Sequence, residues 1–274
     1  MKTIIDSNSS SKLNLSEILR FKSLLWNLSI RDVLVRYKQT FIGVIWAVAK
    51  PVITIVIFGF FSQFIERTDN VSDRFITVSA GVIIWGLIST AITEVSNSIL
   101  SNSNILTKVY FPKIIIPMSS ILVCLIDFFI SFMVLLICKI FISGLPGIEF
   151  LLIPLFLIYA LVFSFGVGLF FATLNVKYRD IKFLLPFLLQ IGFYVCPVFL
   201  STNFYLSKLP ESLKPIFLAD PLLAIIDGFK YCFLGTPMQL QPVYFVTGII
   251  ITLLITLFSL KYFTRFEKTF ADFI

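Results

Sequence analysis

The sequence predicts an all-α membrane protein with six transmembrane helices, and three observations support that fold class. Of the 274 residues, 58% are apolar and only 14% are charged, whereas a soluble domain has about 25% charged residues. Six apolar runs recur along the chain, each near the ~20 residues that a helix needs to cross about 30 Å of hydrocarbon. Lysine and arginine concentrate in alternate connections between the runs. Lipid must therefore solvate much of the surface.

The apolar runs define one transmembrane domain, residues 41–264, between a cytoplasmic segment, 1–40, and a short tail, 265–274. The first run contains the pair Lys50-Pro51. Because proline lacks an amide hydrogen, we expect a kink there that lets Lys50 reach the lipid head groups. The spans are expected at about 41–65, 75–95, 114–138, 150–174, 183–200 and 242–263.

The distribution of positive charge predicts the orientation. With six spans, both termini lie on one side of the membrane, and 16 of the 22 lysines and arginines fall on that side. Cytoplasmic connections carry the excess of positive charge in membrane proteins. We therefore expect both termini in the cytoplasm and a multi-pass protein of the inner membrane.

A basic amphipathic helix is expected before the first span. Within 14–30, apolar residues recur at three- and four-residue steps, with charged residues largely between them. The stretch is too charged to cross lipid, so it suits the membrane surface, a soluble partner, or both. The basic residues expected at this interface are Arg20, Lys22, Arg31 and Arg36.

A short helix is also expected directly before the third span, in the stretch 101–140. Asn102, Ser103 and Asn104 all suit the capping position of a helix, and Pro112 should end the turn that follows. Either this is an ordinary loop with a helical turn, or it docks into a soluble partner and passes motion to the spans. On the second interpretation the contacts come from Ser103, Ile105, Leu106, Lys108, Val109, Tyr110 and Phe111.

The outer segment 201–241 is too long for a simple turn and too apolar for a free loop. Asp220-Pro221 has the form of a helix start, with Asp220 as the cap, and Gly235 suits the far end. We expect short helices within 209–234. They either re-enter the outer leaflet or lie flat at the interface.

Sequence motifs for catalysis are missing. There is no histidine, which removes the usual general base and the commonest metal ligand, and there is no phosphate-binding loop, HExxH or GxSxG motif. We therefore expect no catalytic residue, no metal site and no cofactor in this chain. Two acids fall within spans: Glu94, near the inner end of the second, and Asp127, which we expect to be a buried hydrogen-bonding partner rather than a proton relay.

Aromatic residues are prominent in the first, second and fifth spans. Aromatic faces can stack on sugar rings while the sugar slides, although packing in the core or against lipid explains most of the 32 phenylalanines. The candidates for lining a transport path are Phe58, Phe61, Trp85, Phe193, Tyr194 and Phe199.

Five ordered segments between about residue 24 and the end match a known pattern. They are RDVLVRYKQTFIGVIWAVAKP (31–51), ILTKVYFPKIIIP (105–117), NVKYRDIKFLLPFLLQIGFYVCPV (175–198), DPLLAIIDGF (220–229) and FEKTFADFI (266–274). Together they resemble the membrane subunit of ABC exporters that move polysaccharides and polyol phosphates, the Wzm-like permeases. Lys50 and Asp220 stand where this family is expected to have Gln and Asn.

The resemblance implies the permease subunit of an ATP-driven exporter of a lipid-linked polysaccharide of O-antigen, capsule or teichoic-acid type. Two copies of the chain would enclose a channel, and two copies of a separate ABC ATPase, which holds ATP and Mg, would bind beneath it. Residues 102–112 would be the coupling helix, 14–30 an interface helix, and 209–234 outer gate helices that include Asp220, Pro221 and Asp227. Membrane lipids are expected partners, and nucleic acid is not.

Three other functions fit the composition less well. An ABC permease for a drug or a lipid is disfavoured by the length of the resemblance to glycan exporters. A membrane-embedded glycan-lipid transferase is disfavoured because the chain has no histidine and no cluster of acids. A structural scaffold protein is the remaining class.

Overall fold

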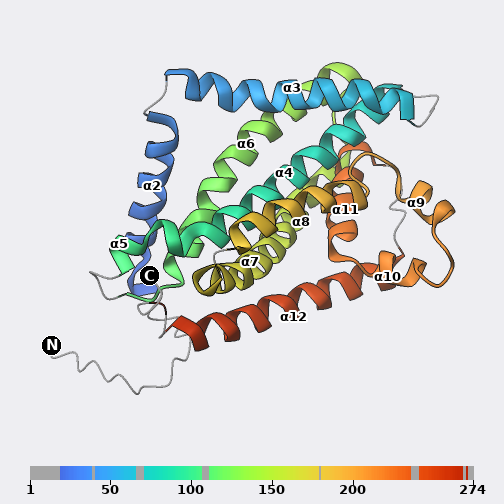
Figure 1. Ribbon diagram of the computed structural model, residues 1–274. Coiled ribbons are helices and arrows are strands. Elements are labelled where there is room, and N and C mark those ends of the chain that lie inside the picture. The colour runs from blue at the N-terminus through green and yellow to red at the C-terminus, as the bar shows by residue number, and fades with distance from the viewer. Residues whose placement is uncertain are drawn as a thin grey trace, which may run out of the picture.

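The computed structural model describes residues 19–38, 41–65, 71–106, 111–178, 180–235, 241–267 and 270, and every regular element in these ranges is a helix (Figure 1). This confirms the all-α fold class. The helices are α2 (Lys22–Lys38), α3 (Phe41–Ile65), α4 (Val71–Ser101), α5 (Ser103–Leu106), α6 (Ile115–Ser143), η1 (Ile148–Leu152), α7 (Ile153–Lys177), α8 (Ile181–Val195), α9 (Thr202–Lys208), α10 (Lys214–Leu218), α11 (Pro221–Leu234) and α12 (Pro242–Phe266).

The central helix of the molecule is α4. It packs against α3, α6, α7 and α11, and 72% of its most apolar 18-residue window is buried. At the contact with α7, a Cβ added to Gly168 would lie 2.8 Å from the side chain of Val95. Glycine therefore lets the two helix backbones approach closely, as small residues do in membrane bundles.

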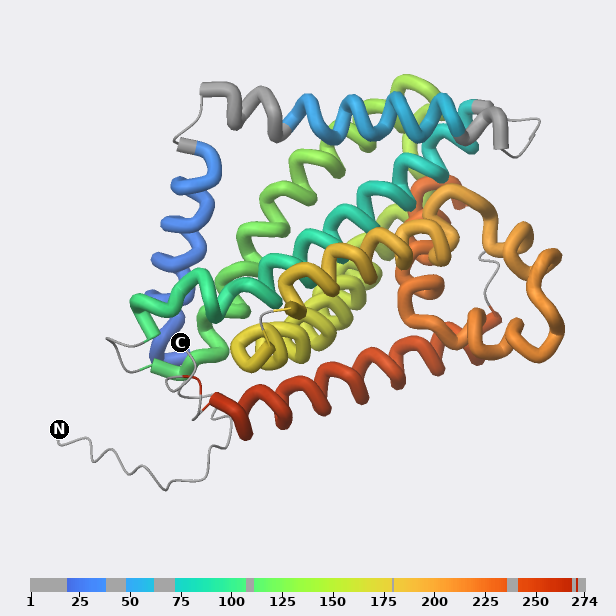
Figure 2. The backbone as a smooth tube through the Cα atoms, in the orientation of Figure 1, coloured from blue at the N-terminus to red at the C-terminus, as the bar shows by residue number. Residues whose placement is uncertain are grey.

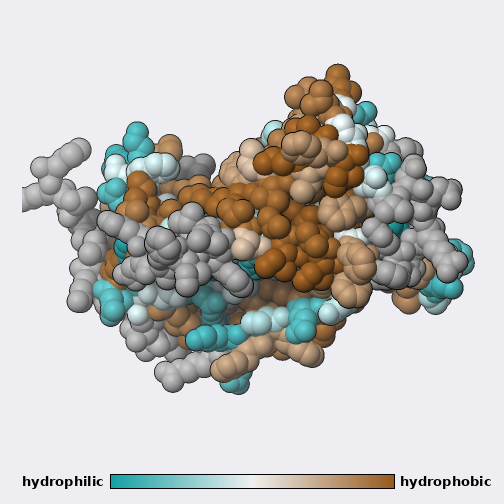
Figure 3. Space-filling view, turned by 90° about the horizontal axis from the view of Figure 1, so that it is seen from above, coloured by the Kyte–Doolittle hydropathy of each residue, from teal (hydrophilic) through white to brown (hydrophobic). Residues whose placement is uncertain are grey.

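The outer helices expose apolar side chains instead of burying them. Only 17% of the corresponding window of α12 and 28% of that of α6 is buried, and Leu254 and Phe141 are 61% and 86% exposed. Figure 3 shows a broad apolar area across the middle of the face that α3 forms. Soluble monomers rarely expose so much contiguous apolar surface. The helices are therefore arranged for a lipid environment.

Four helical segments are long and apolar enough to cross a membrane: α4, α6, η1 with α7, and α12. They correspond to the second, third, fourth and sixth predicted spans. The fifth, α8, has 15 residues, or about 22 Å at 1.5 Å per residue, which is short of ~30 Å. It ends at Val195 rather than at residue 200, because Cys196 is extended and precedes Pro197, and a residue before proline disfavours the helical conformation.

Helix α3 continues through Pro51. It runs from Phe41 to Ile65 with Pro51 inside it, and the kink at this residue stays a prediction. Proline removes one amide donor, and buried packing of the Pro51 ring together with the other helical hydrogen bonds keeps the helix continuous, as is common in membrane helices.

Two groups of short helices lie at opposite ends of the long ones (Figure 2). At one end, α2 lies across the bundle beside α5 and the last turn of α12. A separate core there joins Leu28, Ile99, Phe111 and Phe263. Helix α2 lies in the region of the predicted amphipathic helix, but it extends to Lys38, beyond the predicted end at residue 30. Residues 14–18 lie outside the described ranges.

At the other end lie α9, α10 and the start of α11. The predicted caps of α11 are confirmed: the Asp220 side chain accepts a hydrogen bond from the Leu222 amide, and Gly235 ends the helix at φ 64°. Most of α11 is buried against α4, α7 and α12. Such burial favours a re-entrant helix over one lying flat at the interface.

Candidate functional site: a cavity with an aromatic and a charged end

A cavity of about 1020 Å³ lies among α3, α4, α6 and α8, with the end of α2 at its margin. Its wall combines aromatic rings with hydroxyl, amide and charged groups. The lining residues include Arg36, Tyr37, Lys50, Thr54, Phe58, Trp85, Ser89, Thr90, Thr93, Glu94, Asp127, Phe128, Ser131, Gln190 and Phe193.

The aromatic end of the cavity is a cluster of four rings from α3, α4, α8 and the turn after α8. The Phe193 ring centroid lies 4.7 Å from that of Phe199, 5.7 Å from that of Phe58 and 6.0 Å from that of Trp85. These are the spacings of edge-to-face and tilted aromatic contacts. A Cβ on Gly192 would lie 2.8 Å from the Trp85 ring, so the glycine makes room for the indole.

The charged end of the cavity is a cluster from α2, α4 and α6. Arg36 forms ion pairs with both Glu94 and Asp127, and the Tyr37 hydroxyl donates a hydrogen bond to Asp127. The three charged side chains are 30–40% exposed, so they face the accessible space of the cavity. Asp127 is thus a hydrogen-bonding partner, as predicted, but it is about one-third exposed rather than buried.

Burial and the neighbouring acids determine the protonation of Arg36 and Tyr37. Burial alone would lower the pKa of the Arg36 guanidinium, but Glu94 and Asp127 outweigh burial and raise that pKa. Burial, followed by the hydrogen bond to Asp127, raises the pKa of Tyr37 well above its ordinary value. Arg36 therefore stays charged and Tyr37 stays a neutral donor across the physiological range.

Helix α2 is fixed to the bundle at two further points. The Arg31 guanidinium donates to the Asn102 side-chain oxygen at 2.7 Å, at the junction of α4 and α5. The Ser29 hydroxyl lies 3.4 Å from the backbone oxygen of Ser119 on α6. Arg20 and Lys22 are exposed. Of the four predicted interface residues, Arg36 alone lines the cavity.

The residues predicted to couple to a partner divide into two groups. Ser103, Ile105 and Leu106 form α5, where Ile105 and Leu106 pack against the inner core. Phe111 is 5% exposed and belongs to that core. Lys108, Val109 and Tyr110 lie outside the described residues.

Two hydrogen bonds join the start of the third predicted span to the end of α12. The Lys113 backbone amide donates to the Glu267 side chain at 3.1 Å, and the Lys113 ammonium donates to the Glu267 backbone oxygen at 2.5 Å. Movement at 111–113 would therefore reach α12 as well as α6.

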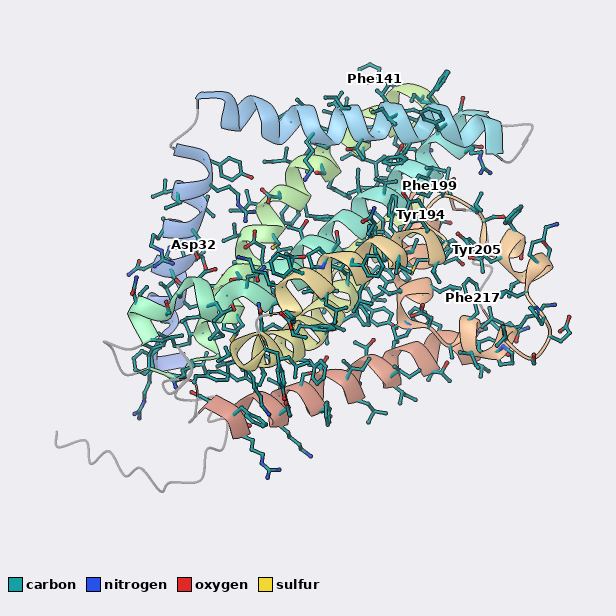
Figure 4. The ribbon with its side chains drawn as sticks, viewed as in Figure 1. Asp32, Phe141, Tyr194, Phe199, Tyr205 and Phe217 are labelled. Carbon is teal, nitrogen blue, oxygen red and sulfur yellow. The ribbon has the colours of Figure 1, made fainter. Side chains whose placement is uncertain are left out.

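The outer helices are joined to the aromatic end of the cavity. The Tyr205 hydroxyl donates to the Tyr194 backbone oxygen at 2.9 Å, and the Tyr205 ring stacks on Phe217 at 5.5 Å (Figure 4). Within this group, the Thr202 hydroxyl donates to Asp227 at 3.1 Å. Pro221 is buried in the first turn of α11. The three predicted gate residues therefore lie in a packed layer beyond the aromatic rings.

The structure brings together some of the predicted path residues and separates others. Phe58, Trp85 and Phe193 line the cavity, and Phe199 packs against two of them. Phe61 and Tyr194 are 57% and 64% exposed on the outer surface. Sequence reasoning did not predict the pairing of Arg36 with Glu94 and Asp127. Two acids within apolar spans were the available signal, because such acids require a partner.

These features define a class: a helical membrane protein with a polar and aromatic cavity and without a nucleotide-binding motif of its own. The chain belongs to the ABC-2 type transporter family, whose model matches residues 23–234. That match runs from α2 through α11 and includes every element that lines the cavity.

Three relatives extend the comparison. The chain is similar to two O-antigen export system permease proteins RfbA of Klebsiella pneumoniae, at 26% and 25% identity, over 92% of this chain and 95% of each relative. It is similar to the O-antigen export system permease protein RfbA of Myxococcus xanthus at 23% identity, over 79% of this chain and 82% of the relative.

Proposed function

We propose that this chain is the permease subunit of an ATP-driven ABC exporter that moves a lipid-linked polysaccharide across the inner membrane. The observation that carries the proposal is the cavity: aromatic rings at one end and hydroxyl, amide and charged groups along its wall. Sugar rings stack on aromatic faces, and sugar hydroxyls bond to such polar groups. The relatives named as O-antigen export permeases support the same substrate class.

The cavity would become a channel when two copies of the chain pair. The chain carries no phosphate-binding loop, so the energy would come from ATP and Mg bound by two copies of a separate ABC ATPase. That ATPase would bind at the end formed by α2 and α5, with the termini in the cytoplasm. Its closure on ATP would move 102–112, and the contacts of Arg31 with Asn102 and of Lys113 with Glu267 would pass this motion to α2 and α12.

At the far end, α9, α10 and α11 would act as the outer gate. They lie beyond the aromatic rings, and the Tyr205 contact with the end of α8 joins them to the cavity wall. A polymer that leaves the cavity would have to displace this layer. The chain itself would perform no bond chemistry.

Deleting the gene and identifying the surface polymer that disappears tests the function. Complementation with the wild-type chain should restore that polymer, whereas Val109→Asp or Tyr110→Asp should abolish export and co-purification of the ATPase. Accumulation of the lipid-linked polymer inside the cell should accompany the loss. Nucleotide hydrolysis by the purified chain alone would contradict the proposal.

A further inference from the structure

We propose that Lys50 is an anion-binding residue of the cavity, and that the exported polymer therefore carries negative charge, as carboxylate or phosphate, on its sugar units. This inference rests on the proposed function and names the substrate class more narrowly. Three observations support it: the place of Lys50 on α3, the absence of a carboxylate within ion-pair distance of its ammonium among the described residues, and the polar and aromatic groups that line the same cavity.

Lys50 lies inside the most apolar helix that lines the cavity. It is nine residues after the first residue of α3 (Phe41), or about 14 Å along the helix axis. A lysine within an apolar membrane helix is costly unless it faces water or a partner. Lys50 is exposed and lines the cavity together with Pro51, Thr54 and Phe58. These residues follow one another at helical spacing, so they form one stripe along α3.

The other cation of the cavity already has partners. Arg36 is held between Glu94 and Asp127. Among the described residues, no carboxylate lies within ion-pair distance of the Lys50 ammonium. Lys50 therefore supplies positive charge to the cavity space, where a bound molecule can meet it.

The groups around Lys50 suit a charged sugar. Thr54, Ser89 and Gln190 line the same cavity and can bond to sugar hydroxyls, while Trp85 and Phe193 add aromatic surface to its wall. A lysine ammonium has three donors on a flexible stem and accepts either carboxylate or phosphate oxygens. A sugar unit that stacks on the rings would thus find its cationic partner in the same space.

Two other roles for Lys50 make different predictions. Glu94 and Asp127 together carry one more negative charge than Arg36, so Lys50 could act as a distant counter-ion for this cluster. Its ammonium could also bind the phosphate of a membrane lipid. If Lys50 is a counter-ion, the effect of removing it should depend on Glu94. If Lys50 binds a lipid phosphate, the effect should depend on which lipid is supplied.

The test uses the full-length permease in phosphatidylcholine nanodiscs and two end-labelled hexasaccharides, anionic oligogalacturonate and neutral maltohexaose. Fluorescence anisotropy measures the affinity for each. We expect the wild type to bind the anionic hexamer about tenfold more tightly, the gain typical of a charge-assisted hydrogen bond. Lys50→Gln should lower the affinity for the anionic hexamer to that for maltohexaose, and an unchanged elution volume in size-exclusion chromatography shows that the variant is folded. Lys50→Arg should keep the preference.

The controls separate the alternatives. Lys182→Gln removes an exposed lysine of α8 outside the cavity lining and should have no effect. If adding Glu94→Gln to Lys50→Gln restores the preference, Lys50 is a counter-ion and the inference is wrong. If phosphatidylglycerol in the nanodiscs removes the wild-type preference, Lys50 binds lipid phosphate and the inference is again wrong. Equal binding of both hexamers overturns the inference alone, whereas binding of neither also overturns the glycan path.

Discussion

The two ends of the cavity are held together by different kinds of contact. At the charged end, a single guanidinium joins three helices through Glu94 and Asp127. At the aromatic end, Phe58, Trp85, Phe193 and Phe199 pack at centroid distances of 4.7–6.0 Å. The charged end depends on matched charges, and the aromatic end depends on the contact area and the shape of the packed rings.

This difference indicates which end of the cavity can accommodate polymers of different sugar composition. Ring faces stack on many sugars without specific hydrogen bonds, so the aromatic end suits a moving polymer. The charged end tolerates change poorly, because losing one partner leaves the others with unbalanced charge. It also includes α2, the helix that lies beside α5. We therefore propose that the charged end controls transport and that the aromatic end guides the polymer.

Removing the buried indole of the aromatic end should have the largest effect on stability. Trp85 is 7% exposed, and Trp85→Ala should lower the free energy of unfolding by about 3 kcal/mol through lost contact area and an unfilled space. Chemical unfolding in mixed micelles measures the change, with Trp85→Phe as the milder control. A loss below about 1 kcal/mol for Trp85→Ala would show that the rings do not hold this end together.

Neutralising the central cation should have the next largest effect. Arg36→Gln leaves Glu94 and Asp127 without a counter-charge and should cost about 1–2 kcal/mol, a figure reduced because these groups are about one-third exposed. The same unfolding measurement checks it. Adding Asp127→Asn should recover part of the loss, because the repulsion between the two acids disappears. Strictly additive losses would mean that the three groups do not act as one cluster.

Asp220 is a carboxylate outside the cavity and has no cationic partner within ion-pair distance among the described residues. It can therefore be compared with the paired acids of the charged end. Burial raises the pKa of Asp220, while the Leu222 amide partly offsets the shift. Stability from this group is therefore fully present below the unfolded pKa of about 3.9 and is lost as pH rises through the folded pKa. Asp220→Asn keeps the cap and should remove this pH dependence, whereas Asp220→Ala should cost about 1 kcal/mol.

Unfolding midpoints of the wild type and Asp220→Asn, followed from pH 4 to pH 8, measure this effect. The advantage of the Asn variant should grow with pH. A constant difference across that range would show that the Asp220 carboxyl does not titrate differently in the folded protein.

The smallest effect is expected for the other arginine that joins α2 to α4. The Arg31 side chain is 42% exposed, and exposed polar pairs contribute little. Arg31→Gln should change the free energy of unfolding by less than about 0.5 kcal/mol. It is the matched control for Arg36→Gln on the same helix. Equal losses of unfolding free energy in the two variants would show that the arginine in the cavity contributes no more than the arginine on the surface.

Much of the fold could be predicted because apolar length and helix caps are local signals. The bounds of α3 and both caps of α11 agree with those predicted from the sequence. The end of α8 and the continuity of α3 through Pro51 could not be predicted as well, because they depend on Pro197 and on packing. Phe61 and Tyr194 could not be told from Phe58 and Phe193, because composition does not indicate which face of a helix turns inward.

The charged end illustrates the same limit. Arg36 was predicted at a partner interface, as part of a basic face. The structure turns its side chain to Glu94 and Asp127, residues 58 and 91 positions away. Only the packing of α2 across α4 and α6 brings these residues together, and no local pattern encodes it.

The most direct test of the central claim, that this cavity is the path of the polymer, is site-specific blocking during export. In a chain whose four cysteines are replaced, Thr90→Cys places a thiol in the cavity wall, and Glu211→Cys places one on an exposed side chain outside it. Thiol modification should stop export in the first variant and leave it unchanged in the second, and a stalled polymer should protect the first thiol. Continued export with a fully modified Thr90→Cys variant would contradict the account.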